Sequence, residues 1–257
     1  MQDPNNVLEG VGLSSQLKKS RIPAKLDFFQ SATGLILALF MWGHMFFVST
    51  ILLGKDAMYT VTKMFEGAYI FEEPHPEIVT IGAGLIFIIF IVHAGIALRK
   101  FPNSFKQYKT FKAHAKMMKH EDTNLWGVQV ITGFTMFFLG SVHLYIIMTH
   151  PDKIGPYASA DRVVDEWMWP LYLLLLLADE WHGSIGLYRL AVKWGWFEGD
   201  NAKESRKKLK KGKIYVTVFF LTLGLLSLAA YIKIGIEHSD KVGERYIPTS
   251  VVETGAH

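Results

Sequence analysis

The sequence contains no cysteine among its 257 residues. This absence excludes disulfide frameworks, thiolate metal sites, cysteine nucleophiles and iron-sulfur ligation by this chain, because each of these needs a thiol. It also excludes the C-x-x-C-H attachment of c-type haem. Any metal bound by this chain must therefore use histidine, methionine or oxygen ligands.

Charged residues are also scarce. Asp, Glu, Lys and Arg make up 19% of the chain and hydrophobic residues 50%, whereas soluble domains carry roughly 25% charged residues. An ordinary soluble globule is therefore not expected. The formal net charge of +4 is too small to indicate a nucleic-acid partner, so the positions of the charges matter more than their sum.

Long apolar runs dominate the sequence, and each is close to the roughly 20 residues that a helix needs to cross a bilayer. They cover residues 30–53, 78–98, 125–148, 168–190 and 214–236. We therefore expect an all-α integral membrane bundle of five transmembrane helices in one domain, residues 1–257, with a polar N-terminal segment (1–27) and a C-terminal tail (237–257). The first run is too long for a signal peptide and is expected to be retained. No internal repeat is evident.

The segments between these runs alternate in charge. Residues 99–122 and 193–213 are rich in lysine and arginine, whereas 54–77 and 149–167 carry mainly aspartate and glutamate. The N-terminal segment adds Lys18, Lys19, Arg21 and Lys25. Because cytoplasmic loops of membrane proteins collect Lys and Arg, this pattern predicts a cytoplasmic N-terminus and a C-terminus outside.

Histidines fall into two groups. Six of the ten lie in predicted loops or tails, where a solvated surface role is ordinary: His75, His114, His120, His150, His238 and His257. Each of the other four lies inside a different predicted span, where an ionisable side chain is costly and marks a candidate functional site. These four are His44, His93, His143 and His182.

The predicted helix directions place the four membrane histidines at two depths. His44 and His143 lie toward the outer side, and His93 and His182 lie toward the cytoplasm. At 1.5 Å per residue, the two levels differ by roughly 13 Å along the membrane normal. A pair of facing imidazoles at each level is the arrangement expected for b-type haem with two histidine ligands. Zinc would recruit a third or fourth close ligand, and none is evident.

Further residues are candidates for contact with such haems. Small residues at helical spacing would leave room for a flat macrocycle, although they also serve plain helix packing: Gly34, Ala38, Gly133, Gly140, Ala178 and Gly186. Propionate groups need cationic or hydrogen-bonding partners near an interface. The candidates are Gln30, Ser31, Trp126 and Lys193 at the cytoplasmic level and Arg162 on the outer side. For Lys193 and Trp126 the alternative is an interfacial anchor.

Several stretches resemble the dihaem cytochrome b subunit of menaquinol:fumarate reductase, a type B succinate:quinone oxidoreductase. The likeness covers nearly all of residues 18–236. Its strongest stretches are AKLDFFQSATG (24–34), GHMFFVSTILL (43–53), HAGIALRKFP (93–102), GFTMFFLGSVHLY (133–145), EWMWPLY (166–172) and EWHGSIGLYRLAVKWGWF (180–197).

The resemblance implies that His93 and His182 bind a proximal haem. It implies that His44 and His143 bind a distal haem, in agreement with the pairing by depth. It also implies a bacterial cytoplasmic (inner) membrane and two partners, a flavoprotein subunit carrying FAD and an iron-sulfur subunit docked on the cytoplasmic face. Whether two such complexes form a dimer stays open.

Two carboxylates are candidates for proton transfer. Quinol oxidation releases two protons with two electrons, so its site needs a proton acceptor. The resemblance assigns this role to Glu66 in MFEGAYIF, whose flanking aromatics are expected to line a quinone-sized pocket near His44 and His143; otherwise Glu66 is one loop carboxylate among several. Glu180 lies two residues before His182 and therefore faces away from the haem. The resemblance implies that Glu180 carries protons across the membrane, and a permanently protonated structural acid is the alternative.

Asp179 departs from the family pattern, which has an apolar residue beside that glutamate. It lies three residues before His182 and so nearer the haem-binding face. Three roles are open for it: it orients His182, it lowers the haem potential through its charge, or it lies among polar neighbours.

We therefore expect a membrane anchor and electron-transfer subunit that oxidises menaquinol and passes electrons through two b haems to an iron-sulfur subunit in anaerobic respiration. The alternative within the class is a succinate dehydrogenase that runs in the opposite direction. From another class comes a haem-free transporter that uses intramembrane His and Glu for proton coupling. A purely structural anchor is the third alternative.

Overall fold

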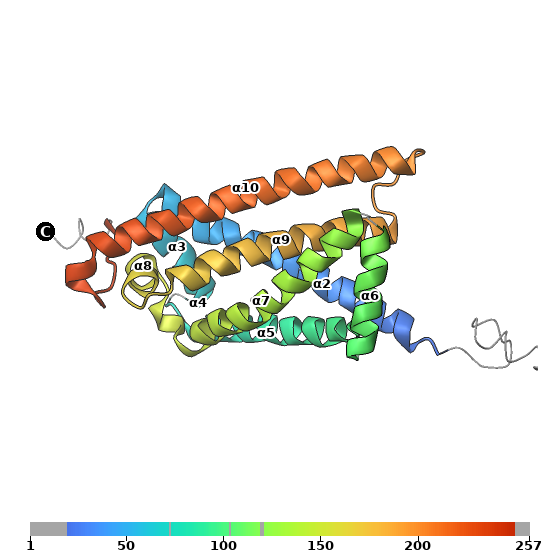
Figure 1. Ribbon diagram of the computed structural model, residues 1–257. Coiled ribbons are helices and arrows are strands. Elements are labelled where there is room, and N and C mark those ends of the chain that lie inside the picture. Colours follow the sequence, from blue (N-terminus) through green and yellow to red (C-terminus); the bar gives the residue numbers. More distant parts are fainter. Residues whose placement is uncertain (1–19, 72, 103, 119–120, 250–257) are drawn as a thin grey trace, which may run out of the picture.

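The computed structural model of the chain describes residues 20–71, 73–102, 104–118 and 121–249, and all regular secondary structure in these ranges is helical (Figure 1). The long helices are α2 (Ile22–Val48), α5 (Glu77–Leu98), α7 (Glu121–Thr149), α9 (Trp169–Trp194) and α10 (Ala202–Glu237). The short ones are η1 (Ser49–Leu53), α3 (Lys55–Phe65), α4 (Ala68–Phe71), α6 (Phe105–Met118), η2 (Pro151–Lys153), α8 (Pro156–Val164) and η3 (Ser239–Lys241). The all-α prediction is confirmed for these ranges. The expectations for Lys18, Lys19, His120 and His257 concern residues outside them.

Four of these helices are long and apolar enough to cross a membrane. They are α2 extended by η1 (Ile22–Leu53), α5, α7 from Thr123, and α10. The remaining predicted span corresponds to α9, which does not meet the same criterion. Asp179, Glu180 and His182 interrupt its apolar sequence. Five spans, and the orientation of the termini, therefore stay predictions.

Two helices extend well beyond the apolar runs that predicted them. α2 begins at Ile22 rather than near residue 30, and α10 begins at Ala202 rather than near residue 214. Hydropathy detects only the apolar part of a helix, whereas backbone hydrogen bonding continues through the lysine-rich start of α10. Asn201 caps this start, because its side-chain oxygen accepts from the amides of Lys203 and Glu204.

Four long helices form a ring, in which α5 and α9 each pack on both α2 and α7. α10 lies outside this ring, against α9, α8 and α2 (Figure 1). Gly224 permits the close approach of α10, since a Cβ atom there would overlap Leu176 Cδ1 and lie 2.7 Å from Met45 Cε. The ring therefore encloses an interior to which each of its four helices contributes one face.

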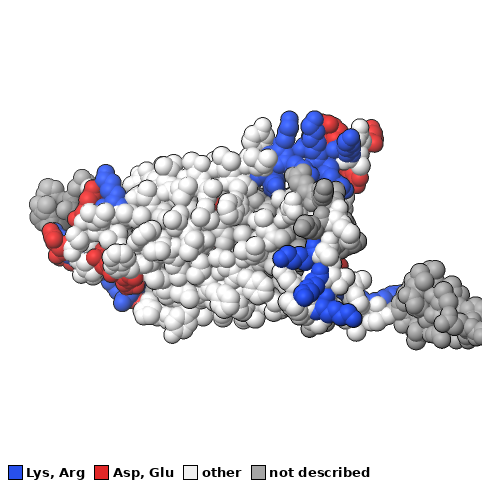
Figure 2. Space-filling model, in the orientation of Figure 1, with Lys and Arg blue, Asp and Glu red and all other residues white. Residues whose placement is uncertain are grey.

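Charged side chains gather at the two ends of the molecule and leave an uncharged belt between them (Figure 2). We call one end the basic end; it holds α6 and the first turns of α10. The opposite end holds α3, α4 and α8 (Figure 1). Within the belt, α5 exposes large apolar side chains such as Ile81, Leu85 and Ile88. This distribution is the one expected of helices that cross a bilayer.

The chain turns back over α3 after the end of α10. Asp56 accepts hydrogen bonds from the hydroxyl of Tyr246 (2.8 Å) and from the amide and hydroxyl of Thr249 (3.1 and 2.7 Å). The side-chain hydrogen bond from Thr249, followed by that from Tyr246, holds the pKa of Asp56 below its ordinary value of 3.8. An ionised carboxylate therefore anchors the C-terminal segment to α3.

The anchor at Asp56 should depend on pH. Because the docked state has the lower pKa, the contact is complete above the ordinary pKa and is lost as the pH falls through the lower docked value. Asp56→Asn should mimic the acid state at neutral pH and increase amide hydrogen exchange near Tyr246 and Thr249 severalfold. Asp240→Asn, in the nearby η3, is the matched control. Unchanged exchange in Asp56→Asn would contradict this account.

Candidate functional site

A cavity of about 1430 Å³ runs through the ring of helices. Pockets for drug-sized ligands measure roughly 300–1,000 Å³, so this cavity can hold more than one such group. His44 of α2, His93 of α5, His143 of α7 and His182 of α9 all line it. Within the described ranges no cluster of three or more His, Cys, Asp or Glu side chains is arranged to hold a metal ion. The cavity therefore offers paired imidazoles rather than a compact metal cage.

The rings of His44 and His143 lie next to each other, with 6.1 Å between their centroids and an angle of 55° between their planes. A bond from a metal to an imidazole nitrogen is about 2 Å long, which places ring centres on either side of one metal roughly 6 Å apart. Phe40 stacks on His44, and Tyr172 meets the ring of His143 edge-on. Nδ1 of His143 is buried without a hydrogen-bond partner in the described part of the chain. This pair has the spacing to hold one iron between two rings.

His93 lies in a cradle formed by α2. Its Nδ1 lies 3.0 Å from the hydroxyl of Thr33, which itself donates to the carbonyl of Phe29 at 2.7 Å. The hydroxyl therefore accepts from Nδ1, and Nε2 is left as the free nitrogen of the ring. A Cβ atom at Gly34 would lie 2.9 Å from His93 Cε1, so glycine is what admits the ring.

His182 lies in an equivalent cradle formed by α7. Its Nδ1 lies 2.9 Å from the carbonyl oxygen of Gln129 and 3.4 Å from the hydroxyl of Thr132. Because a carbonyl only accepts, Nδ1 carries the proton and Nε2 is free to bind a metal. A Cβ atom at Gly133 would lie 2.9 Å from His182 Cε1.

The two cradles share a short sequence pattern, QSATG at 30–34 and QVITG at 129–133. In both helices the next cavity histidine follows ten residues after the glycine, from Gly34 to His44 and from Gly133 to His143. This shared pattern was not identified from the sequence alone. The pattern is easily missed because only a glutamine, a threonine and a glycine are common to the two stretches. Its role is recognisable only in the structure, where both helices form a cradle for a histidine.

The small residues expected to leave room for a macrocycle have a partly different role. Gly34 and Gly133 admit the histidine rings of neighbouring helices. Ala38, Gly140 and Gly186 line the cavity, as do those two glycines, whereas the described lining does not include Ala178.

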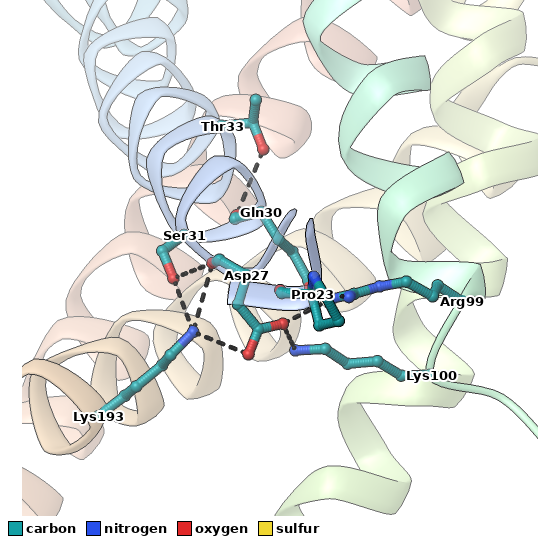
Figure 3. A network of polar contacts seen from close by, with 8 residues as sticks. All are labelled: Pro23, Asp27, Gln30, Ser31, Thr33, Arg99, Lys100 and Lys193. Atoms are coloured by element: carbon teal, nitrogen blue, oxygen red, sulfur yellow. Dashed lines mark hydrogen bonds and ion pairs between the residues drawn. The ribbon is translucent and has the colours of Figure 1, made fainter. Parts of the chain in front are cut away.

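The candidate propionate contacts at the basic end all line the cavity: Gln30, Ser31, Trp126 and Lys193. The ammonium of Lys193 donates to the hydroxyl of Ser31 and to the carbonyl of Asp27, both at 3.3 Å (Figure 3). The side-chain oxygen of Gln30 is buried without a partner among the residues described. The ammonium of Lys193 and the amide nitrogen of Gln30 are donors that can serve an anionic group in the cavity, whereas the Gln30 oxygen can only accept.

Two cations that sequence reasoning missed line the same cavity, Lys100 and Arg189. Arg189 lies seven residues after His182, which is about two helical turns and therefore the same face. The spacing of seven residues could therefore have identified Arg189 from the sequence as a cation on the same helix face as His182. Lys100 follows the end of α5, where its direction depends on the tertiary fold rather than on helix periodicity.

Arg162 lines the cavity at the opposite end and is only 5% exposed. Its guanidinium donates to the carbonyl of Lys153. The neighbouring Asp161 accepts from Nδ1 of His238 at 2.8 Å, and the His238 ring stacks on Tyr157. The expectation that His238 is a solvated tail histidine is therefore wrong, because the end of α10 packs on α8 and buries it.

Glu66 is buried at the C-terminal end of α3, at the opposite end. Its carboxylate pairs with the ammonium of Lys63 at 2.6 Å. The described lining of the cavity includes Thr62 and Phe65 of the same helix but not Glu66 itself. Of the expected aromatics, only Phe65 lines the cavity, and Tyr69 and Phe71 of α4 are exposed. The chain turns away directly after Glu66, at Gly67, where φ is +78°.

Asp179 and Glu180 face different surroundings, as their angular separation on the helix predicts. Asp179 lines the cavity. Glu180 is 0% exposed, lies outside the described lining, and has no hydrogen-bond partner for either carboxyl oxygen within the described ranges. Nδ1 of His182 is already bound by Gln129, which argues against orientation of this ring by Asp179.

The chain is similar to known membrane proteins of one class. Residues 106–225 match the family described as succinate dehydrogenase/fumarate reductase transmembrane subunit. The chain is 58% identical over 229 residues to the fumarate reductase cytochrome b subunit of Wolinella succinogenes, covering 89% of this chain and 90% of that protein. It is 53% identical over 235 residues to those of two Helicobacter pylori strains, covering 91% of this chain and of each relative.

The chain therefore belongs to the fumarate reductase cytochrome b subunits, which confirms the family predicted from its sequence. It is a membrane anchor within an oxidoreductase complex and works with the other subunits of that complex. The name cytochrome b implies haem b, and the cavity fits such a group. Its four imidazoles and the 6.1 Å spacing of one pair support that fit.

Gly133→Ala tests whether the cradle positions His182. The new methyl group would meet the ring at 2.9 Å, so the ring must move against its hydrogen bond to Gln129. Overpacking of this kind typically costs about 1–3 kcal/mol. We expect reduced haem content and a lower melting temperature. Gly127→Ala on the same helix, where a Cβ atom meets nothing within 4 Å, is the control. Equal haem content in the two variants would contradict the cradle.

Proposed function

We propose that this chain oxidises menaquinol near the end of the molecule that lies opposite the basic end, and that it delivers the electrons to an iron-sulfur subunit at the basic end. A flavoprotein subunit with FAD then uses these electrons to reduce fumarate in anaerobic respiration. Two b haems, when bound, supply the one-electron steps between these partners. The observation that carries the proposal is the single cavity lined by one histidine from each of four helices.

In this proposal His93 and His182 hold the proximal haem. The support is their matched cradles, which hold Nδ1 of each ring and leave Nε2 free. His44 and His143 hold the distal haem, supported by the spacing of their rings. Gln30, Ser31, Trp126 and Lys193 serve the propionates at the basic end, and Arg162 serves those at the opposite end.

We further propose that α9 is the fifth membrane span and that the basic end faces the cytoplasm of a bacterial inner membrane. α9 packs between α7, α2 and α10. Its polar groups therefore face the cavity or neighbouring helices rather than lipid, which is the usual arrangement for ionisable residues inside a membrane. The lysines of α6 and α10 give the basic end the charge typical of cytoplasmic loops and a surface for the iron-sulfur subunit.

Glu66 is proposed as the proton acceptor for menaquinol. It is buried beside the cavity, and Lys63 balances its charge. A cationic partner is the usual company of a buried carboxylate, whose oxygens are the groups that would accept a quinol proton. Thr62 and Phe65, which line the cavity, place this part of α3 next to the space that a quinol ring would enter.

Glu180 is proposed as a proton carrier within the membrane. Its carboxyl group is fully buried, with no hydrogen-bond partner among the described residues that would mark it as a structural acid. Glu180→Gln should keep both haems but lower quinol-linked turnover by about tenfold or more. Turnover with menaquinol at the wild-type rate would remove the carrier role.

The proposed function is tested on the intact purified complex. We expect fumarate reduction with a menaquinol analogue, together with a b-type signal in the reduced-minus-oxidised spectrum. A complex that oxidises succinate but does not turn over with menaquinol and fumarate would instead support the succinate dehydrogenase alternative. A spectrum without any b-type signal would contradict the proposal and would support the alternative function, that of a haem-free transporter.

A further inference from the structure

Asp27, near the start of α2, is the centre of an ionic network at the basic end (Figure 3). One of its carboxyl oxygens lies 2.6 Å from the guanidinium of Arg99 and 3.1 Å from the ammonium of Lys100. The other lies 3.6 Å from the ammonium of Lys193. A single carboxylate therefore gathers three cations from two segments far apart in the sequence.

These cations belong to the two helices that carry the proximal histidines. Arg99 and Lys100 directly follow α5, which holds His93, and Lys193 lies in the last turn of α9, which holds His182. α5 and α9 each pack on α2. Asp27 thus joins both histidine-bearing helices to α2 at the end of the molecule nearest this pair.

The network has a side that faces the cavity and a side that does not. Lys100 and Lys193 line the cavity, whereas the described lining includes neither Asp27 nor Arg99. Ser31 reinforces the arrangement, because its hydroxyl accepts from Lys193 and donates to the carbonyl of Asp27 at 2.9 Å. The Asp27 carboxylate therefore binds the ammonium groups of Lys100 and Lys193 from the side away from the cavity. The positive charges of these two lysines remain available to a group bound in the cavity.

We propose that Asp27 is a positioning residue for the proximal haem, an inference that rests on the proposed function. It fixes Lys100 and Lys193 at the mouth of the cavity, where the anionic propionates need partners, and it offsets part of their positive charge. Three cations against one carboxylate keep this end of the cavity electropositive. Asp27 thereby sets both the position and the strength of the field that acts on the haem nearest the basic end.

The experiment is a potentiometric titration of both haems in the intact complex. Asp27→Asn removes a negative charge with little change of shape, so the oxidised and more positive form of the proximal haem loses stabilisation. We expect the proximal midpoint potential to rise and the distal potential to stay unchanged. Asp27→Glu should retain the wild-type potentials. Asp56→Asn, the same substitution at the opposite end, should leave the proximal potential unchanged.

Two results would overturn the inference. One is a lower melting temperature in Asp27→Asn with an unchanged proximal potential, which would make Asp27 only a link between helices. The other is an equal shift of both potentials. If the Asp27→Asn complex does not assemble, Arg99→Gln is the second test of the inference. Loss of this positive charge should lower the midpoint potential of the proximal haem, and an unchanged potential would contradict the inference. Wild-type complex without haem would contradict the proposed function itself, before any variant is measured.

Discussion

His182→Ala should remove the proposed proximal haem and, with it, the proposed delivery of electrons to the iron-sulfur subunit. Alanine cannot bind iron, and it leaves the carbonyl of Gln129 and the hydroxyl of Thr132 without their ring partner. The distal pair lies on α2 and α7, away from the substitution, and should keep its haem. We expect the haem content of the purified complex to fall from two per chain to one and quinol-linked fumarate reduction to fall to background.

His150→Ala is the matched control for this variant, because His150 is an exposed loop histidine at the opposite end. It should keep both haems and full turnover. If His182→Ala retained both b-type absorption bands, the assigned ligation would be wrong.

Glu66→Gln should stop quinol oxidation while leaving both haems in place. Glutamine keeps the shape of the side chain but cannot take up a proton from the quinol. Loss of a general base typically lowers a rate by about 10²–10⁴-fold. The measurement is turnover with a menaquinol analogue, together with chemical reduction of the haems, which should be complete in the variant.

Lys63→Met gives a second test of the same site. It removes the cation that lies 2.6 Å from the Glu66 carboxylate, so the buried carboxylate loses the partner that offsets its charge. We expect slower turnover with a menaquinol analogue and unchanged haem content. Glu77→Gln, an exposed carboxylate at the same end, is the control. Wild-type turnover of Glu66→Gln would remove its role as proton acceptor.

The proximity of His44 and His143 could be predicted from the sequence because it depends on helix direction and depth. Long apolar runs locate the helices, loop charge predicts their direction, and each of the first four predicted spans contains one histidine. Those rules are local and one-dimensional. They place the rings of His44 and His143 at one level, and in the structure the centroids of these rings lie 6.1 Å apart.

The cradles and the ionic network could not be predicted, because they depend on contacts between helices. Thr33 is recognisable as a partner of His93 only once α2 and α5 are packed together. Asp27 likewise appears in the sequence as a carboxylate in a basic segment, and its three cations lie about 70 and 165 residues further along the chain. Helix periodicity carries no information about such partners.

Hydropathy also could not predict which residues are buried at the two ends of the molecule. His238 follows the last apolar run and resembles a tail residue, yet α8 and Asp161 enclose it. α8 is a short amphipathic helix in a segment whose charges predict only a loop. Its effect on neighbouring residues comes from packing against α10, which includes a contact at Gly235 too close for any larger residue.

Haem quantitation with a redox titration of the intact complex tests the central claim most directly. Four imidazoles in one cavity predict two b-type haems per chain with separate midpoint potentials, each lost when its own histidine pair is disrupted. A single haem per chain, or none, would contradict the account.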